Sequence, residues 1–136
     1  MAKDILISTD LTMLTWSAAL CALIWVPYIL ARISAWGLLD AVGYPESPPP
    51  VAAWSARLHK AHLNLVENLA PFAALVLVAH VAGVANETTA LGAQIFFWAR
   101  VVHAIAYVFA IPFLRTLAFA AGIAGMAMIF AVIVGW

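Results

Sequence analysis

Four apolar stretches, each long enough to cross a bilayer as a helix, constrain this chain more than any other feature. They cover about residues 11–33, 60–82, 90–111 and 114–135. A helix needs about 20 apolar residues to cross the hydrocarbon core, so four spans use most of the 136 residues. A bilayer offers no water to pair with backbone groups, which favours helices. We therefore expect one all-α domain, residues 1–136, folded as an integral membrane four-helix bundle.

The composition agrees with a membrane protein and excludes several functions. Hydrophobic residues make up 67% of the chain and charged residues 9%, against roughly 45–50% and 25% in soluble domains. The formal net charge is zero, so no nucleic acid partner is expected. The single cysteine, Cys21, excludes an intrachain disulfide and a dithiol redox pair, and no metal site is predicted.

Local signals mark the ends of the spans. Residues 1–10 form a short polar lead, and Pro27 is expected to kink the first span because proline lacks a backbone donor. Glycine and proline recur so often in residues 34–55 that we predict a stiff loop without a helix. Gly83 is expected to end the second span, and the stretch 86–89 to cap the third.

The basic residues near the span ends predict the topology. Arg32, Arg57, Lys60 and Arg115 flank the first and third connections, whereas the second connection has no lysine or arginine. Short loops rich in these residues stay in the cytoplasm. We therefore expect the first and third connections to be cytoplasmic and both termini to lie on the other side, with Lys3 as weak contrary evidence.

Two spans carry stripes of polar residues. Residues three or four positions apart share a helix face, and each stripe keeps this spacing. The stripes are Lys60, Asn64 and Glu67 on the second span, and Arg100, His103 and Tyr107 on the third. A charged side chain costs roughly 2.5–3.5 kcal/mol at the centre of a bilayer, so these groups should face protein and have partners.

The depths of the two stripes suggest an ion pair. If the second and third spans form an antiparallel hairpin that turns near residue 85, Glu67 and Arg100 lie within about three residues in depth, or about 4.5 Å. We predict that they pair inside the membrane. The pair could serve only to fix the register of the helices. The many polar neighbours around it favour a functional site instead.

Three motifs together resemble the signature of a known family. They are Lys60-Ala-His-Leu-Asn-Leu-Val-Glu-Asn68, Arg100-Val-Val-His-Ala-Ile-Ala-Tyr107 and Arg115-Thr116. They resemble the MAPEG family, the membrane-associated proteins of eicosanoid and glutathione metabolism, in the branch of the microsomal glutathione transferases and prostaglandin E synthases. Leu63 stands where the prostaglandin synthases carry an arginine. Leu65 replaces the aspartate that usually follows the asparagine in the family, and Lys60 stands where the family usually has arginine. The chain looks more like the bacterial members.

The resemblance implies a site and an activity. It implies a homotrimer that holds glutathione between subunits near the cytoplasmic face of a bacterial inner membrane. The residues expected to line this site are Lys60, Asn64, Glu67, Arg100, His103 and Tyr107. Arg115 would stabilise the thiolate, and Thr116 would add a hydrogen bond to the sulfur. The implied function is a glutathione-dependent transferase or peroxidase that acts on a hydrophobic electrophile.

The fourth span adds an argument for assembly. Ala118, Ala121, Gly122 and Gly125 give it small faces, which allow close contact between helices. Two other functions stay open. The chain could be a non-catalytic membrane scaffold that keeps the polar core for stability. It could also be a small multidrug-type exporter, although residues 11–33 lack the carboxylate expected for proton coupling.

Overall fold

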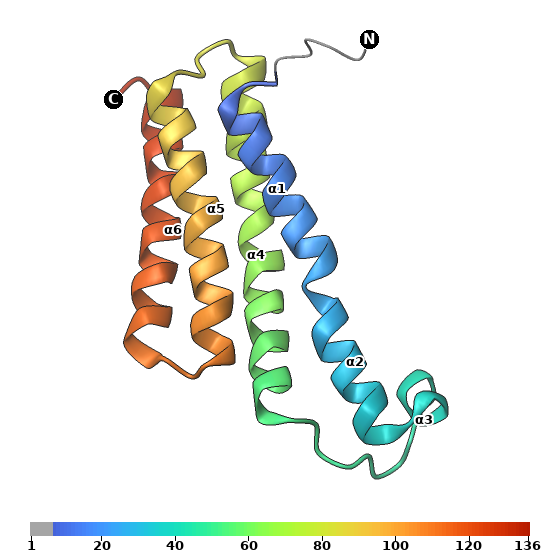
Figure 1. Cartoon of the computed structure of the whole chain (residues 1–136). Helices are drawn as coiled ribbons and strands as arrows, with labels where there is room; N and C mark the ends of the chain where they lie inside the picture. The colour runs from blue at the N-terminus through green and yellow to red at the C-terminus, as the bar shows by residue number, and fades with distance from the viewer. Residues whose placement is uncertain (1–6) are drawn as a thin grey trace.

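The computed structural model describes residues 7–136, and every regular element in this part of the chain is a helix (Figure 1). The helices are α1 (Thr9–Leu23), α2 (Trp25–Trp36), α3 (Leu38–Val42), α4 (Ala53–Val81), α5 (Glu87–Val108) and α6 (Pro112–Ile133). The joined α1 and α2, and α4, α5 and α6, are each long and apolar enough to cross a membrane. The prediction of an all-α four-span bundle is confirmed. Residues 1–6, with Lys3, lie outside the described part.

The first span is broken close to its expected kink. α1 ends at Leu23 and α2 begins at Trp25, with Ile24 as the joint. Pro27 has no N–H to donate to the carbonyl of Leu23, four residues earlier, so one helical hydrogen bond is missing at this point. In Figure 1 the lower part of this span, α2, slopes away from α6 and ends at α3.

The first connection contains a short helix, so the prediction of a loop without helix was wrong here. α3 covers five residues, Leu38–Val42, between Gly37 and Gly43. This stretch contains neither glycine nor proline, and the N–H of Ala41 donates to the carbonyl of Gly37 at 3.0 Å. One turn of helix therefore fits between the two glycines. The prolines keep residues 44–52 free of helix.

Asp10 belongs to the bundle rather than to a polar lead. α1 already begins at Thr9, and only 2% of the surface of Asp10 is exposed. The Asp10 carboxylate accepts hydrogen bonds from the backbone N–H of Leu11 at 3.1 Å and from the hydroxyl of Thr89 at 3.4 Å. This contact ties the start of α1 to the start of α5.

The helices α4 and α5 end in turns of the same form. After α4, Gly83 has a φ of +71°, and the next N–H donates to the carbonyl of Ala79 at 3.0 Å. After α5, Ala110 has a φ of +55°, and the next N–H donates to the carbonyl of Ala106 at 2.9 Å. Both are left-handed C-terminal caps. The expected end at Gly83 is confirmed, as is the cap of α5, where Asn86 forms a capping box.

These two turns give a matched pair of variants. Ala110→Gly should stabilise the protein, because a left-handed conformation costs an L-residue about 1 kcal/mol more than glycine. Gly83→Ala should destabilise it by a similar amount for the same reason. Thermal denaturation in detergent would compare both variants with the wild type. A loss of stability in Ala110→Gly would contradict this account of the turn.

Close contact between α5 and α6 forms one side of the bundle. A Cβ on Gly92 or Gly125 would lie 2.5 Å from the backbone oxygen of the other glycine, so only glycine allows this approach. Beside it, the rings of Phe72 on α4 and Phe96 on α5 stack with centres 3.8 Å apart. The small face of α6 therefore packs inside the subunit, against α5. It supplies no separate argument for assembly.

Candidate functional site

The two polar stripes and the start of α6 meet at one pocket of about 220 Å³. Its lining consists of Asn64, His103, Tyr107, Arg115, Thr116 and Phe119. Five of the eight site residues predicted from the sequence are thus brought together. They come from three helices, and Asn64 on α4 is about 40 or more residues from the others along the chain.

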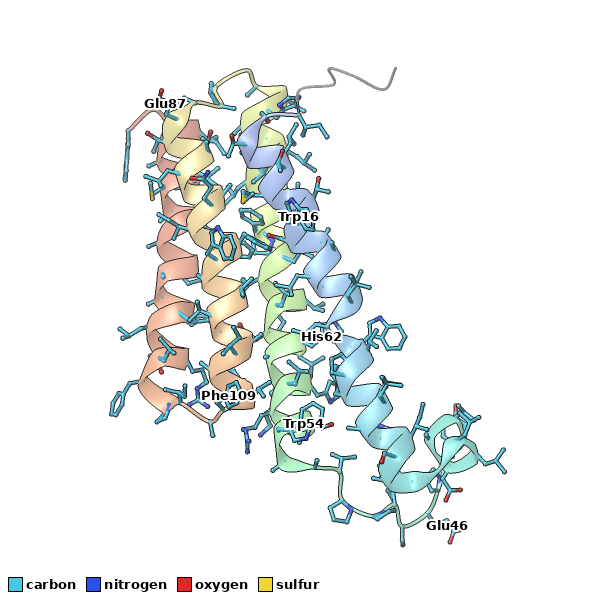
Figure 2. The ribbon with its side chains drawn as sticks, in the orientation of Figure 1. Trp16, Glu46, Trp54, His62, Glu87 and Phe109 are labelled. Atoms are coloured by element: carbon cyan, nitrogen blue, oxygen red, sulfur yellow. The ribbon has the colours of Figure 1, made fainter. Side chains whose placement is uncertain are left out.

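Local structure explains how these residues meet. α5 and α6 are joined by a short turn, at Phe109 in Figure 2, so the last turns of α5 lie beside the first turns of α6. His103 and Tyr107 are one helical turn apart on α5, and Arg115 lies in the first turn of α6 after Pro112. α4 closes the pocket with Asn64.

Arg100 lies buried next to this pocket, with only 1% of its surface exposed. Its Nη1 donates to the side-chain oxygen of Asn64 at 2.6 Å. The guanidinium carbon lies 5.1 Å from the ring centre of Phe96 and 5.3 Å from that of Phe119. Gly122 leaves room for it, since a Cβ there would lie 3.3 Å from Nη2.

Two donor atoms of Arg100 are unused within the described part of the chain. Nε and Nη2 are buried and have no hydrogen-bond partner among residues 7–136. A buried cation with unpaired donors is costly, because each donor has lost its water without gaining an acceptor. This part of the site therefore calls for an acceptor, and an anion would satisfy it best.

The predicted ion pair between Glu67 and Arg100 is wrong within the subunit. Glu67 is exposed on the surface of α4, whereas Arg100 is buried and bonds to Asn64. Residue numbers place Glu67 and Arg100 at nearly the same depth in the membrane. They do not determine how α4 is rotated about its axis. Asn64 points toward α5, so it takes the place expected for Glu67.

Lys60 and Glu67 are the two predicted site residues that line neither the pocket nor the surroundings of Arg100. Both are exposed, one turn before and one turn after Asn64 along α4. The single subunit thus carries a cation and a carboxylate on an outer face that continues from the pocket. Lys60 and Glu67 can contact a ligand held by the pocket only if that ligand extends beyond the pocket of this subunit.

Two further polar residues of the site, Arg115 and His103, contact the ring of Tyr107. The guanidinium carbon of Arg115 lies 5.1 Å from the centre of the Tyr107 ring, a cation–π contact. The rings of His103 and Tyr107 have centres 4.9 Å apart. The Thr116 hydroxyl donates to the carbonyl of Pro112 at 3.3 Å, so its hydrogen is directed at the backbone in this structure.

Three further residues support the site, and none of them was predicted from the sequence as a site residue. Arg57 donates from Nε to the carbonyl of Tyr107 at 2.8 Å and from Nη2 to that of Val108 at 2.9 Å. It thereby donates to two carbonyls in the last turn of α5 that have no helical donor four residues later. Asn68 donates to the carbonyl of Asn64 at 2.8 Å, and Phe119 covers Arg100. The last carbonyls of a helix lack backbone donors, and this requirement was the signal that could have identified Arg57.

An apolar cavity lies on the neighbouring side of α5. It has a volume of about 370 Å³ and opens where the first span is broken. Its walls come from α1, α2, α4 and α5, and they are Leu20, Leu23, Ile24, Pro27, Leu58, Val101, Ala104, Ile105, Val108 and Phe109. α5 therefore separates a polar pocket from an apolar one.

The fold and site define an integral, multi-pass membrane protein with a cationic pocket between its helices. The MAPEG family model matches residues 13–135, nearly the whole chain, so the chain belongs to the MAPEG family. The proteins of this family are associated with glutathione. No curated protein sequence matches the chain.

Proposed function

We propose that the chain is a glutathione-dependent membrane transferase or peroxidase that acts on a hydrophobic electrophile. The observation that carries this proposal is the pocket itself, in which Arg115 lines one wall beside a buried Arg100 with two unused donors. Such a site favours an anionic ligand. Arg115 would then lie beside an ionisable group of that ligand. Membership of a glutathione-associated family makes glutathione the first candidate.

The charges around the pocket suit this ligand. Glutathione carries two carboxylates, one ammonium group and a thiol. Arg100 and Lys60 offer cations for the carboxylates, and Glu67 offers a carboxylate for the ammonium group. Charge-assisted hydrogen bonds of this kind are about twice as strong as neutral ones. This leaves Arg115 for the sulfur.

A shared site between subunits accounts for the exposed pair Lys60 and Glu67. The pocket of one subunit holds about 220 Å³, less than the roughly 300–1,000 Å³ typical of small-molecule sites. A neighbouring copy placed against this face of α4 would enlarge the pocket and bury both charges with the ligand. We propose the homotrimer of the family for this assembly.

The chain's own residues would stabilise the sulfur and make space for the electrophile. Bound glutathione supplies the nucleophilic sulfur. Arg115 stabilises the negative charge of the thiolate, and the Tyr107 ring holds the guanidinium in place. Thr116 can add its hydroxyl once this turns from the Pro112 carbonyl. The apolar cavity on the other side of α5 offers space for a hydrophobic electrophile that enters from the bilayer.

The orientation follows from the basic residues. The turn between α5 and α6 and the connection between α2 and α4 lie at the same end of the bundle (Figure 1). We propose that this end faces the cytoplasm, where glutathione is available, and that the membrane is a bacterial inner membrane. The start of α1 and the end of α6 lie at the opposite end.

The test is the binding of glutathione to the purified protein in detergent, measured by calorimetry, with the mass of the intact complex measured in parallel. We expect a trimer that binds glutathione, and weaker binding in Lys60→Ala and Glu67→Gln. His80→Ala, a change at the far end of α4, is the control and should bind as the wild type. A monomer that binds fully would contradict the shared site. No binding by a trimer would contradict the function.

A further inference from the structure

A second group of reactive side chains lies between the first span and α4, away from the polar pocket. The sulfur of Cys21 lies 3.9 Å from Nε2 of His62, within the range of a hydrogen bond to sulfur. The hydroxyl oxygen of Tyr28 lies 2.7 Å from Nδ1 of the same ring. Figure 2 labels His62 beside the joint of α1 and α2. None of these three residues lines the site described above.

The arrangement is that of a nucleophile, a base and a residue that orients the base. If the Nδ1–H of His62 donates to the oxygen of Tyr28, Nε2 is left as the acceptor for the thiol proton. Tyr28 is itself fixed, since it is buried and its carbonyl accepts from the hydroxyl of Ser55 at 3.5 Å. The ring of His59 packs against Tyr28 at 4.8 Å and does not extend this chain of contacts.

A separate observation gives the group an unused hydrogen-bond donor that a ligand's oxygen could take up. Ser17 is fully buried, and its hydroxyl has no hydrogen-bond partner among residues 7–136. It lies four residues before Cys21, on the same face of α1, so the two side chains are neighbours. An unpaired buried hydroxyl is costly. A carbonyl oxygen placed beside Cys21 would accept its hydrogen.

We propose that Cys21 is a second nucleophile, carried by the chain itself, that captures apolar α,β-unsaturated carbonyl compounds from the bilayer. The sulfur forms a bond to the β-carbon, and the electron pair of the carbon–carbon double bond moves to give an enolate. His62 takes the thiol proton at Nε2 and returns it to the α-carbon. The product is a thioether on Cys21, with His62 neutral again.

The surroundings select the class of electrophile. Cys21 is partly buried and packs against the apolar core, so charged reagents are excluded. A free thiolate is also costly there, which makes a base within reach necessary. The carbonyl oxygen develops negative charge in the enolate, and Ser17 is the donor for it. This capture needs no glutathione, so it stands apart from the proposed function.

The test measures the rate at which N-ethylmaleimide adds to the folded protein in detergent, without glutathione, by intact mass. The chain has one cysteine, so a single adduct reports Cys21. His62→Gln should slow the addition at least about tenfold, since general-base catalysis contributes roughly 10²–10⁴-fold. His59→Gln is the matched control, because it alters a neighbouring histidine without contact to Cys21, and should react as the wild type.

Two more variants keep the test independent of a folding defect in His62→Gln. Tyr28→Phe keeps the ring and removes the orienting hydroxyl, so it should also slow the addition. Ser17→Ala should slow N-ethylmaleimide but leave the reaction of Cys21 with benzyl bromide, which has no carbonyl, unchanged. Equal rates in the wild type, His62→Gln and Tyr28→Phe would overturn the proposal. So would a wild type that reacts only after it is unfolded.

Discussion

Arg115→Ala should shift the ionisation of bound glutathione upward by at least about one pH unit, the size of effect that a neighbouring cation has on an acid. The guanidinium of Arg115 lines the pocket and is held against Tyr107. Without it, the thiolate loses its counter-charge, and the fraction of nucleophile at neutral pH falls. The measurement is the ultraviolet absorbance of the thiolate against pH.

Three controls make this result specific. Arg115→Lys keeps the charge but loses the flat group that stacks on Tyr107, so an intermediate shift is expected. Arg32→Ala removes a cation that instead packs against Trp36 on α2, and it should leave the midpoint unchanged. Ophthalmate, which lacks the thiol, should bind Arg115→Ala and the wild type equally. An unchanged midpoint in Arg115→Ala would leave this residue as a membrane anchor.

Arg100→Met should leave the free protein as stable as the wild type or more so, and should abolish stabilisation by glutathione. In the free protein, two donors of the buried guanidinium have no partner among the described residues, and an apolar side chain of similar length removes that cost. The wild type should gain about 2.7 kcal/mol at a glutathione concentration one hundred times Kd. Heating with and without glutathione measures both effects.

The partner of Arg100 supplies the comparison. Asn64→Leu removes the one side chain among residues 7–136 that bonds to Arg100, and should cost the free protein about 1.5–3 kcal/mol. The double variant should be more stable than Asn64→Leu alone. Glu67→Gln should not show this coupling in the free protein. A large loss of stability in Arg100→Met without ligand would make Arg100 a structural residue.

The sequence predicted the helices and most of the pocket for clear physical reasons. Helix ends follow local rules, so Gly83 and Asn86 could be recognised from their neighbours. The polar stripes could be recognised because a charged side chain inside an apolar segment is costly and is usually retained for a function. Asn64, His103 and Tyr107 lie in the pocket as this argument requires.

Contacts between helices were harder to predict. Depth in the membrane follows from residue number, but rotation about the helix axis depends on packing, so Glu67 was chosen where Asn64 makes the contact. The close approach of Gly92 to Gly125 depends on residues of both α5 and α6. The small residues of α6 alone did not show which helix they pack against. The contact of Cys21 with His62 joins residues 41 positions apart, with no pattern in the sequence between them.

The close contact between Gly92 and Gly125 also bears on how such a protein can evolve. It makes α5 and α6 one stiff hairpin, which carries His103, Tyr107 and Arg115 of the polar pocket. The apolar cavity takes much of its wall from the first span, which lies outside that hairpin. If this cavity holds the electrophile as proposed, substitutions in α1 and α2 would alter the choice of hydrophobic substrate and leave the chemistry of the sulfur the same. On this proposal, mutational drift in the first span would be a route to new substrates.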